Sequence, residues 1–121
     1  MSLLVICLAA GCAGSKGPEI LVDGDTYKFG KVKEGQEVVF TFFFTNPGSG
    51  DLLIKDLYIS CECVHVKKYD RRVKPGARGQ VYGVIDTKGL SGETFRAIKL
   101  TTNIPGKEEV LLMLEGEVVQ P

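Results

Sequence analysis

The chain has 121 residues, and its 15 Lys and Arg are balanced by 15 Asp and Glu, so the formal net charge at pH 7 is zero. A length of this size fits one domain, and a composition that is 44% hydrophobic and 25% charged excludes a wholly disordered or collagen-like chain. Because phosphate binding favours an excess of basic residues, the balanced charge argues against a nucleic acid partner.

The N-terminal segment is apolar, with an unbroken run over residues 3–10. The run is too short for a membrane-spanning helix, which needs about 20 residues, and it has the length of the hydrophobic part of a signal peptide. Ala9-Ala10-Gly11-Cys12 resembles a bacterial lipobox, in which the chain is cut before the cysteine and that cysteine receives the lipid. We therefore expect a lipoprotein signal peptide over residues 1–11 and a lipid on Cys12. The alternative is a buried N-terminal strand.

Residues 12–19 are small, polar and interrupted by Gly and Pro, which predicts a flexible tether. A lipidated cysteine implies export to the bacterial cell envelope, with the outer membrane and its periplasmic side favoured as the location. Such a compartment permits disulfides. Cys7 would leave with the signal peptide, so that Cys61 and Cys63 are the two cysteines of the folded body.

From Ile20 onward the hydrophobic pattern has a period of two, which is typical of half-buried strands. We expect about seven strands: an early one around Tyr27 and Phe29, followed by residues 38–45, 52–59, 62–67, 80–86, 94–102 and 110–118. Turn signals rich in Gly, Pro and Asn separate most of them. The pattern predicts one all-β antiparallel sandwich over residues 20–121. Its expected core includes Phe40, Phe42, Ile54, Ile98, Leu112 and Leu114.

Several segments, in order, resemble the bacterial domain of unknown function 1573. They are Phe29-Gly30-Lys31-Val32 with Gly35, the strand Phe42–Asn46, the sequence Ser60-Cys61-Glu62-Cys63, and the closing Leu114–Val118. The resemblance covers about residues 26–118. It implies an immunoglobulin-like sandwich related to PapD-type and ciliary-protein domains, in exported proteins that are often lipoproteins and have no established molecular function. The family places Gly between the two cysteines, whereas this chain has Glu62, which resists the positive φ angles that Gly permits.

Cys61, Cys63 and His65 would point to one face of an extended strand. Thiolate and imidazole are donors that suit Cu(I) or Zn(II), so a metal site is one interpretation. A second is a Cys61–Cys63 disulfide, which requires a bend and would be labile and redox-active. A third is a pair of structural thiols beside an incidental histidine. The sequence leaves all three open.

A basic run follows the cysteines: Lys67, Lys68, Arg71, Arg72, Lys74 and Arg78. It predicts binding to an acidic partner, anionic lipid headgroups or a polyanionic glycan, and the alternative is a solvated loop. Phe43 lies on the face opposite Phe42 and is either an exposed contact or covered by a loop.

Signatures of enzymes are missing from the sequence, which has one histidine and no G-x-S-x-G motif. We therefore expect a non-catalytic, monomeric, lipid-anchored binding or scaffold domain that needs no cofactor and recognises an envelope protein or glycan. The alternative is a redox or copper- or zinc-handling envelope protein that acts through Cys61, Cys63 and His65. An enzyme of unrecognised type is a third class.

Overall fold

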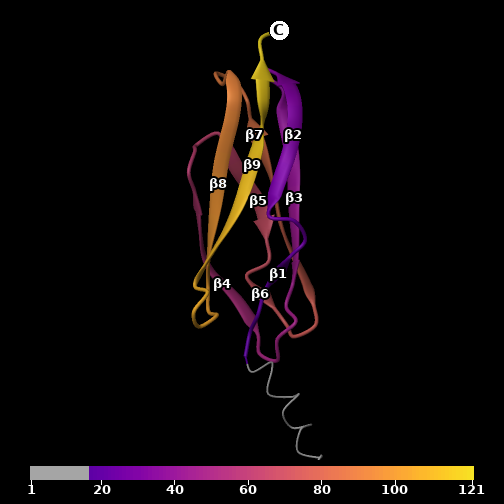
Figure 1. The fold of residues 1–121 in the computed structure, drawn as a ribbon, viewed down its shortest axis with the longest axis vertical. Coiled ribbons are helices and arrows are strands. Elements are labelled where there is room, and N and C mark those ends of the chain that lie inside the picture. The colour runs from indigo at the N-terminus through magenta and orange to yellow at the C-terminus, as the bar shows by residue number, and fades with distance from the viewer. Residues whose placement is uncertain (1–16) are drawn as a thin grey trace, which may run out of the picture.

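The computed structural model describes residues 17–121, which form a two-layer β-sandwich (Figure 1). The predicted signal peptide, the lipidation site Cys12 and most of the tether lie outside the described residues. Within the described part, no helix is long and apolar enough to cross a membrane. The strands are β1 (Leu21–Val22), β2 (Thr26–Lys33), β3 (Glu37–Thr45), β4 (Leu52–Ile59), β5 (Val64–Tyr69), β6 (Arg72–Val73), β7 (Arg78–Asp86), β8 (Gly92–Thr102) and β9 (Glu109–Val119).

The strand order identifies the type of sandwich. One sheet has the order β1-β3-β7-β5 and the other has the order β2-β9-β8-β4-β6. If β1 and β2 are read as two parts of one strand that changes sheets, the first sheet has the A-B-E-D order and the second contains the C-F-G order of immunoglobulin-like domains. The predicted all-β, immunoglobulin-like sandwich is confirmed.

Two details differ from the predicted pattern of about seven antiparallel strands. The chain crosses between sheets at Asp23-Gly24-Asp25, so the first strand is divided and β2 pairs with β9 in parallel. The chain also crosses after β5, where the amide of Ile54 on β4 donates to the carbonyl of Arg71 at 2.8 Å and β6 pairs with the start of β4. These crossings add the two-residue strands β1 and β6.

The core follows from the period-two pattern. On β3, Val38, Phe40, Phe42 and Phe44 point between the sheets and are buried. All six predicted core residues are buried, each with an exposed fraction of 2% or less. Because every strand contributes alternate residues to one layer, the sandwich closes without a helix.

The two ends of the sandwich carry different loops. At the end where the described chain begins, the Gly17 amide donates to Ser49 Oγ at 3.0 Å. At the other end, the Gly89 amide of the β7–β8 loop donates to Glu34 Oε2 of the β2–β3 turn at 2.8 Å. In Figure 1 the described chain starts at the lower end and the C terminus lies at the upper end. We call these the entry end and the far end.

Candidate functional site

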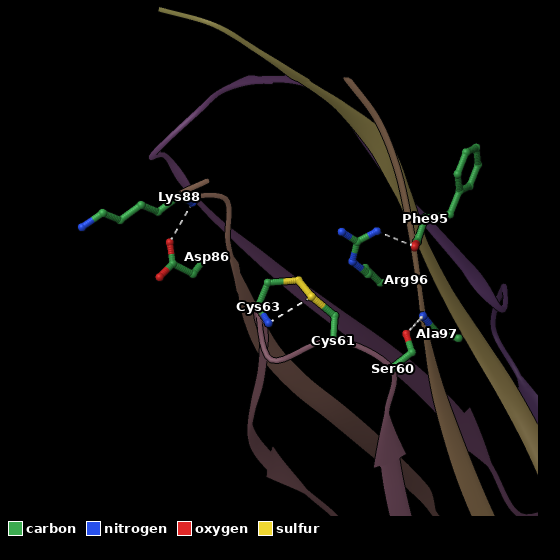
Figure 2. Close-up of a disulfide and its surroundings, with 8 residues drawn as sticks. All are labelled: Ser60, Cys61, Cys63, Asp86, Lys88, Phe95, Arg96 and Ala97. Atoms are coloured by element: carbon green, nitrogen blue, oxygen red, sulfur yellow. Dashed lines mark hydrogen bonds between the residues drawn. A yellow bond between two sulfur atoms is a disulfide. The ribbon is translucent and has the colours of Figure 1, made fainter. Parts of the chain in front are cut away.

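The cysteine pair forms a disulfide in the turn between β4 and β5, shown in Figure 2. The Cα atoms of Cys61 and Cys63 are 5.1 Å apart. Strand β4 ends at Ile59 and β5 begins only at Val64, so neither cysteine lies in an extended strand. The strand expected over residues 62–67 is present, but it starts two residues later, at Val64. The expectation that both thiols and His65 lie in line on one face of an extended strand is wrong. Of the three interpretations of the pair, the structure contains the disulfide.

Backbone hydrogen bonds hold this turn to both sheets. On one side, the Ser60 amide donates to the Ala97 carbonyl at 3.1 Å, and the Ala97 amide donates to Ser60 Oγ at 3.0 Å. On the other side, the Asp86 amide donates to the Cys63 carbonyl at 2.8 Å. The Val64 amide donates to the Cys61 carbonyl at 3.2 Å, which closes the turn. The disulfide turn therefore links β8 of one sheet to the end of β7 in the other.

Both cysteines are half-buried. Cys61 and Cys63 pack against the edge of the core, while Glu62 between them is exposed. The amide of Cys63 donates to Cys61 Sγ at 3.1 Å. Figure 2 shows Asp86, Lys88 and Arg96 around the turn, and the Asp86 carboxylate accepts the Lys88 amide at 3.0 Å.

Arg96 is a residue that the sequence analysis missed. It stands on β8 between Thr94 and Ile98, in the series that points into the sandwich, although it is half-exposed. Its Nη1 donates to the Phe95 carbonyl at 2.8 Å, and within residues 17–121 no carboxylate forms a salt bridge with it. The sequence did contain a signal for this residue, since Arg96 is a charged side chain at an inward position of an alternating strand. Its neighbour Ala97 is the residue that bonds the disulfide turn, which brings Arg96 into this site.

The structure does not bring the proposed metal ligands together. Over residues 17–121, no group of three His, Cys, Asp or Glu side chains is arranged to hold a metal ion. His65 is exposed on β5, where it pairs with Val84, and both sulfur atoms of the cysteine pair are bonded to each other.

The basic run lies on one flank, from the edge strand β5 toward the entry end. Lys67 and Lys68 are exposed on β5, and Lys74 is exposed beyond β6. Arg71 stacks over the Tyr69 ring at 5.1 Å from its centroid, and Arg72 forms a 2.7 Å salt bridge with Asp51. These residues form a spread-out basic flank rather than a part of the disulfide site.

Phe43 lies on the outer face of β3, as the alternation predicted, and of the two interpretations left open it is the exposed one, with 38% of its surface accessible. The guanidinium of Arg78 lies over its ring at 4.3 Å from the centroid. The same arginine forms a salt bridge of 3.0 Å with Asp23, so its charge is already engaged.

Solved structures with the same fold come from proteins of very different kinds. A protein of unknown function from Porphyromonas gingivalis W83 superposes with a TM-score of 0.75 at 14% identity, over 85% of this chain and 48% of that chain. The secreted serine protease VesC of Vibrio cholerae gives 0.66 at 12% identity, over 97% of this chain and 26% of that chain. The ASH/PapD-like domain 7 of human CEP192 gives 0.61 at 10% identity, over 87% and 88%. This chain thus spans about half of the Porphyromonas protein and a quarter of the protease.

At such identities the likeness concerns the fold alone. No functionally curated protein matches the sequence. The sequence profile of one family, described as "Protein of unknown function (DUF1573)", matches residues 20–118, which is nearly the whole described body. The chain belongs to the DUF1573 family.

Proposed function

We propose that this protein is a monomeric, lipid-anchored binding module of the bacterial cell envelope, tethered through Cys12 and working without catalysis. Its partner is an envelope protein or glycan, reached on the periplasmic side of the outer membrane. The proposal is supported by the lipobox-like sequence before Cys12 and by a fold whose loops and sheet edges are suited to binding.

The observation that carries this proposal is the placement of the loops at opposite ends of the sandwich. Gly17, the first described residue, is bonded to the β3–β4 turn at the entry end. The β2–β3 turn and the β7–β8 loop meet at the far end, and the disulfide turn is bonded to the last residue of β7. A tether on the N-terminal side therefore leaves these three segments directed away from its attachment point.

The basic flank fits the same orientation. Lys74 and its neighbours lie toward the entry end, where a lipid tether would hold the body near anionic headgroups. Lysines of this kind attract a negatively charged surface without specifying a partner. We therefore assign partner recognition to the far end and membrane proximity to the basic flank.

The test is site-specific photo-cross-linking in cells that produce the full chain. A photoreactive residue replaces Lys88 at the far end or Lys107 in the β8–β9 turn at the entry end; both side chains are exposed. We expect discrete cross-linked species from position 88. The probe at position 107 should give none of these species. Equal patterns from both positions, or none from position 88, would contradict the assignment of the far end.

The alternative function is a redox or copper- or zinc-handling envelope protein that acts through Cys61, Cys63 and His65; its metal-handling form has less support than binding. It would require the Cys61–Cys63 bond to be reduced before either sulfur could act as a thiolate ligand. Metal analysis of the reduced, purified protein separates the two functions. Near-stoichiometric copper or zinc that is lost in Cys63→Ser would favour metal handling over binding.

A further inference from the structure

We propose that the Cys61–Cys63 disulfide exchanges with thiols of a partner protein, with Cys63 Sγ as the atom attacked and Cys61 Sγ as the leaving atom. The chemical class of substrate is an accessible pair of cysteine thiols on an envelope protein. This inference goes beyond the binding function, because it adds a covalent step that does not depend on where the chain is anchored.

The Cys61–Cys63 bond contributes little to the stability of the fold. Only one residue separates the two cysteines. A disulfide stabilises a fold by restricting the unfolded chain, and the effect grows with the length of the loop that it closes, so this bridge is near the lower limit. Hydrogen bonds from Ser60, Val64 and Asp86 already hold the turn to both sheets. The fold therefore gains little from the sulfur–sulfur bond itself.

Reduction of the bond would leave the two thiols in place. The backbone bonds of Ser60 to β8 and of Cys63 to the end of β7 do not involve sulfur. With both flanks held, the thiols stay next to each other, which favours reformation of the bond over capture by solution reagents. Both cysteines are half-exposed, so a partner thiol has access from the solvent side.

A hydrogen bond to one of the two sulfur atoms gives the reaction its direction. The Cys63 amide points at Cys61 Sγ, at 3.1 Å, and a hydrogen bond of this kind strengthens when the acceptor becomes a thiolate. Within residues 17–121, no such donor is directed at Cys63 Sγ. The sulfur whose charge is better stabilised leaves more readily, so the incoming thiolate attacks Cys63.

Charged groups around the turn act on the same step. Arg96 precedes Ala97, the residue of β8 that bonds the turn, and it carries a positive charge without a salt-bridge partner among the described residues. The carboxylates of Glu62 and Asp86 oppose this charge, but Glu62 is exposed and Asp86 accepts the Lys88 amide. A cation beside a cysteine favours its thiolate.

The exchange balances without a further oxidant. A partner thiolate forms a bond to Cys63 Sγ, the Cys61–Cys63 bond breaks, and its electron pair leaves with Cys61 Sγ. The second partner thiol loses its proton to solvent and attacks the partner's own sulfur in the mixed disulfide, which releases the Cys63 thiolate. Two electrons pass from the partner to this protein, the two new thiolates take up protons, and the partner gains a disulfide. Each protein molecule oxidises one thiol pair, so the exchange is stoichiometric rather than catalytic.

The direction is tested on the purified full chain carrying Cys7→Ser and Cys12→Ser, so that Cys61 and Cys63 are the only cysteines. The protein reacts briefly with a synthetic peptide that has a single cysteine, and iodoacetamide then caps free thiols. Fragmentation mass spectrometry of the proteolytic peptide locates each group. We expect the synthetic peptide on Cys63 and the cap on Cys61; the reverse pattern, or no mixed disulfide, would overturn the proposal.

The role of the charge is tested by rates in the same background. The probe is a peptide with two cysteine thiols, and one peptide disulfide should form per protein molecule. Arg96→Gln should slow the exchange about threefold or more, because the leaving thiolate loses a nearby cation, while Arg96→Lys keeps the rate. Arg71→Gln, which removes an arginine stacked on Tyr69, is the matched control. Equal rates for Arg96→Gln and Arg71→Gln, with circular dichroism showing that both are folded, would overturn the role of Arg96.

Discussion

At the scale of single residues, the consecutive aromatics Phe42 and Phe43 have opposite environments. Phe42 is 2% exposed and packs edge-to-face against Phe40, with ring centroids 5.8 Å apart. Phe43 keeps 38% of its surface exposed and contacts the Arg78 guanidinium on the outer face. A phenylalanine side chain therefore packs in the core at position 42 and makes a surface contact at position 43.

This pair gives a stability prediction with an internal control. Phe42→Ala should lower the free energy of unfolding by about 3–5 kcal/mol, because it leaves a cavity between the sheets. Phe43→Ala should cost about 1 kcal/mol, mainly through the lost contact with Arg78. Urea unfolding followed by circular dichroism measures both values. Similar losses for the two variants would mean that the alternation of β3 had been assigned to the wrong faces.

At the scale of elements, one buried side chain joins three segments at the entry end. Asn46 has an exposed fraction of 0%. Its Oδ1 accepts the amides of Glu19 and Gly48, and its Nδ2 donates to the carbonyls of Gly50 and Val73. All of its hydrogen-bonding capacity is used inside the protein, which is what a buried amide requires. Asn46 thus fixes the first described residues to the β3–β4 turn and to β6.

Replacing this amide should loosen the entry end. Asn46→Ala leaves buried backbone groups without partners, so we expect a loss of about 3 kcal/mol or more in the free energy of unfolding. Faster amide hydrogen exchange should appear at Glu19 and Gly48. Asn103→Ala is the control, since Asn103 is half-exposed and its side chain makes two such bonds, to Leu53 and Asp51. An effect of Asn103→Ala as large as that of Asn46→Ala would refute the special role of Asn46.

At the scale of the whole molecule, the two ends of the sandwich have separate tasks in the proposed function. The entry end receives the chain from the tether, and the far end presents three loops.

The anchoring part of this arrangement is tested by Cys12→Ser. In the producing bacterium, mass spectrometry should find the unchanged protein cut before residue 12 and carrying lipid, and the variant uncut or without lipid. Cys7→Ser, which alters the apolar run but not the attachment site, should be processed normally. If Cys12→Ser were processed and retained in the membrane fraction like the unchanged chain, lipid attachment at Cys12 would be excluded.

Much of the fold could be predicted because its signals are local. The alternation of Val38 to Phe44 identifies a half-buried strand and its inward face, and the family resemblance adds the immunoglobulin-like order. The division of the first strand could not be predicted, since the crossing at Gly24 depends on where β9 offers a free edge to β2. For the candidate site, the sequence identified Cys61 and Cys63 but left their chemistry open.

The sequence alone determined what each short segment can do: which residues alternate, where Gly and Pro break the strands, and that one residue separates the two cysteines. Only the tertiary structure decided how these segments meet. In the structure, the cysteines lie in a turn that is hydrogen-bonded to β7 on one side and to β8 on the other. His65 lies apart from them on the edge strand β5, and Arg96 is adjacent to the residue of β8 that bonds the turn. The physical reason is that periodicity records the exposure of a residue along its own strand, whereas the neighbours of a turn come from strands distant in sequence, and their register is set by packing between the sheets.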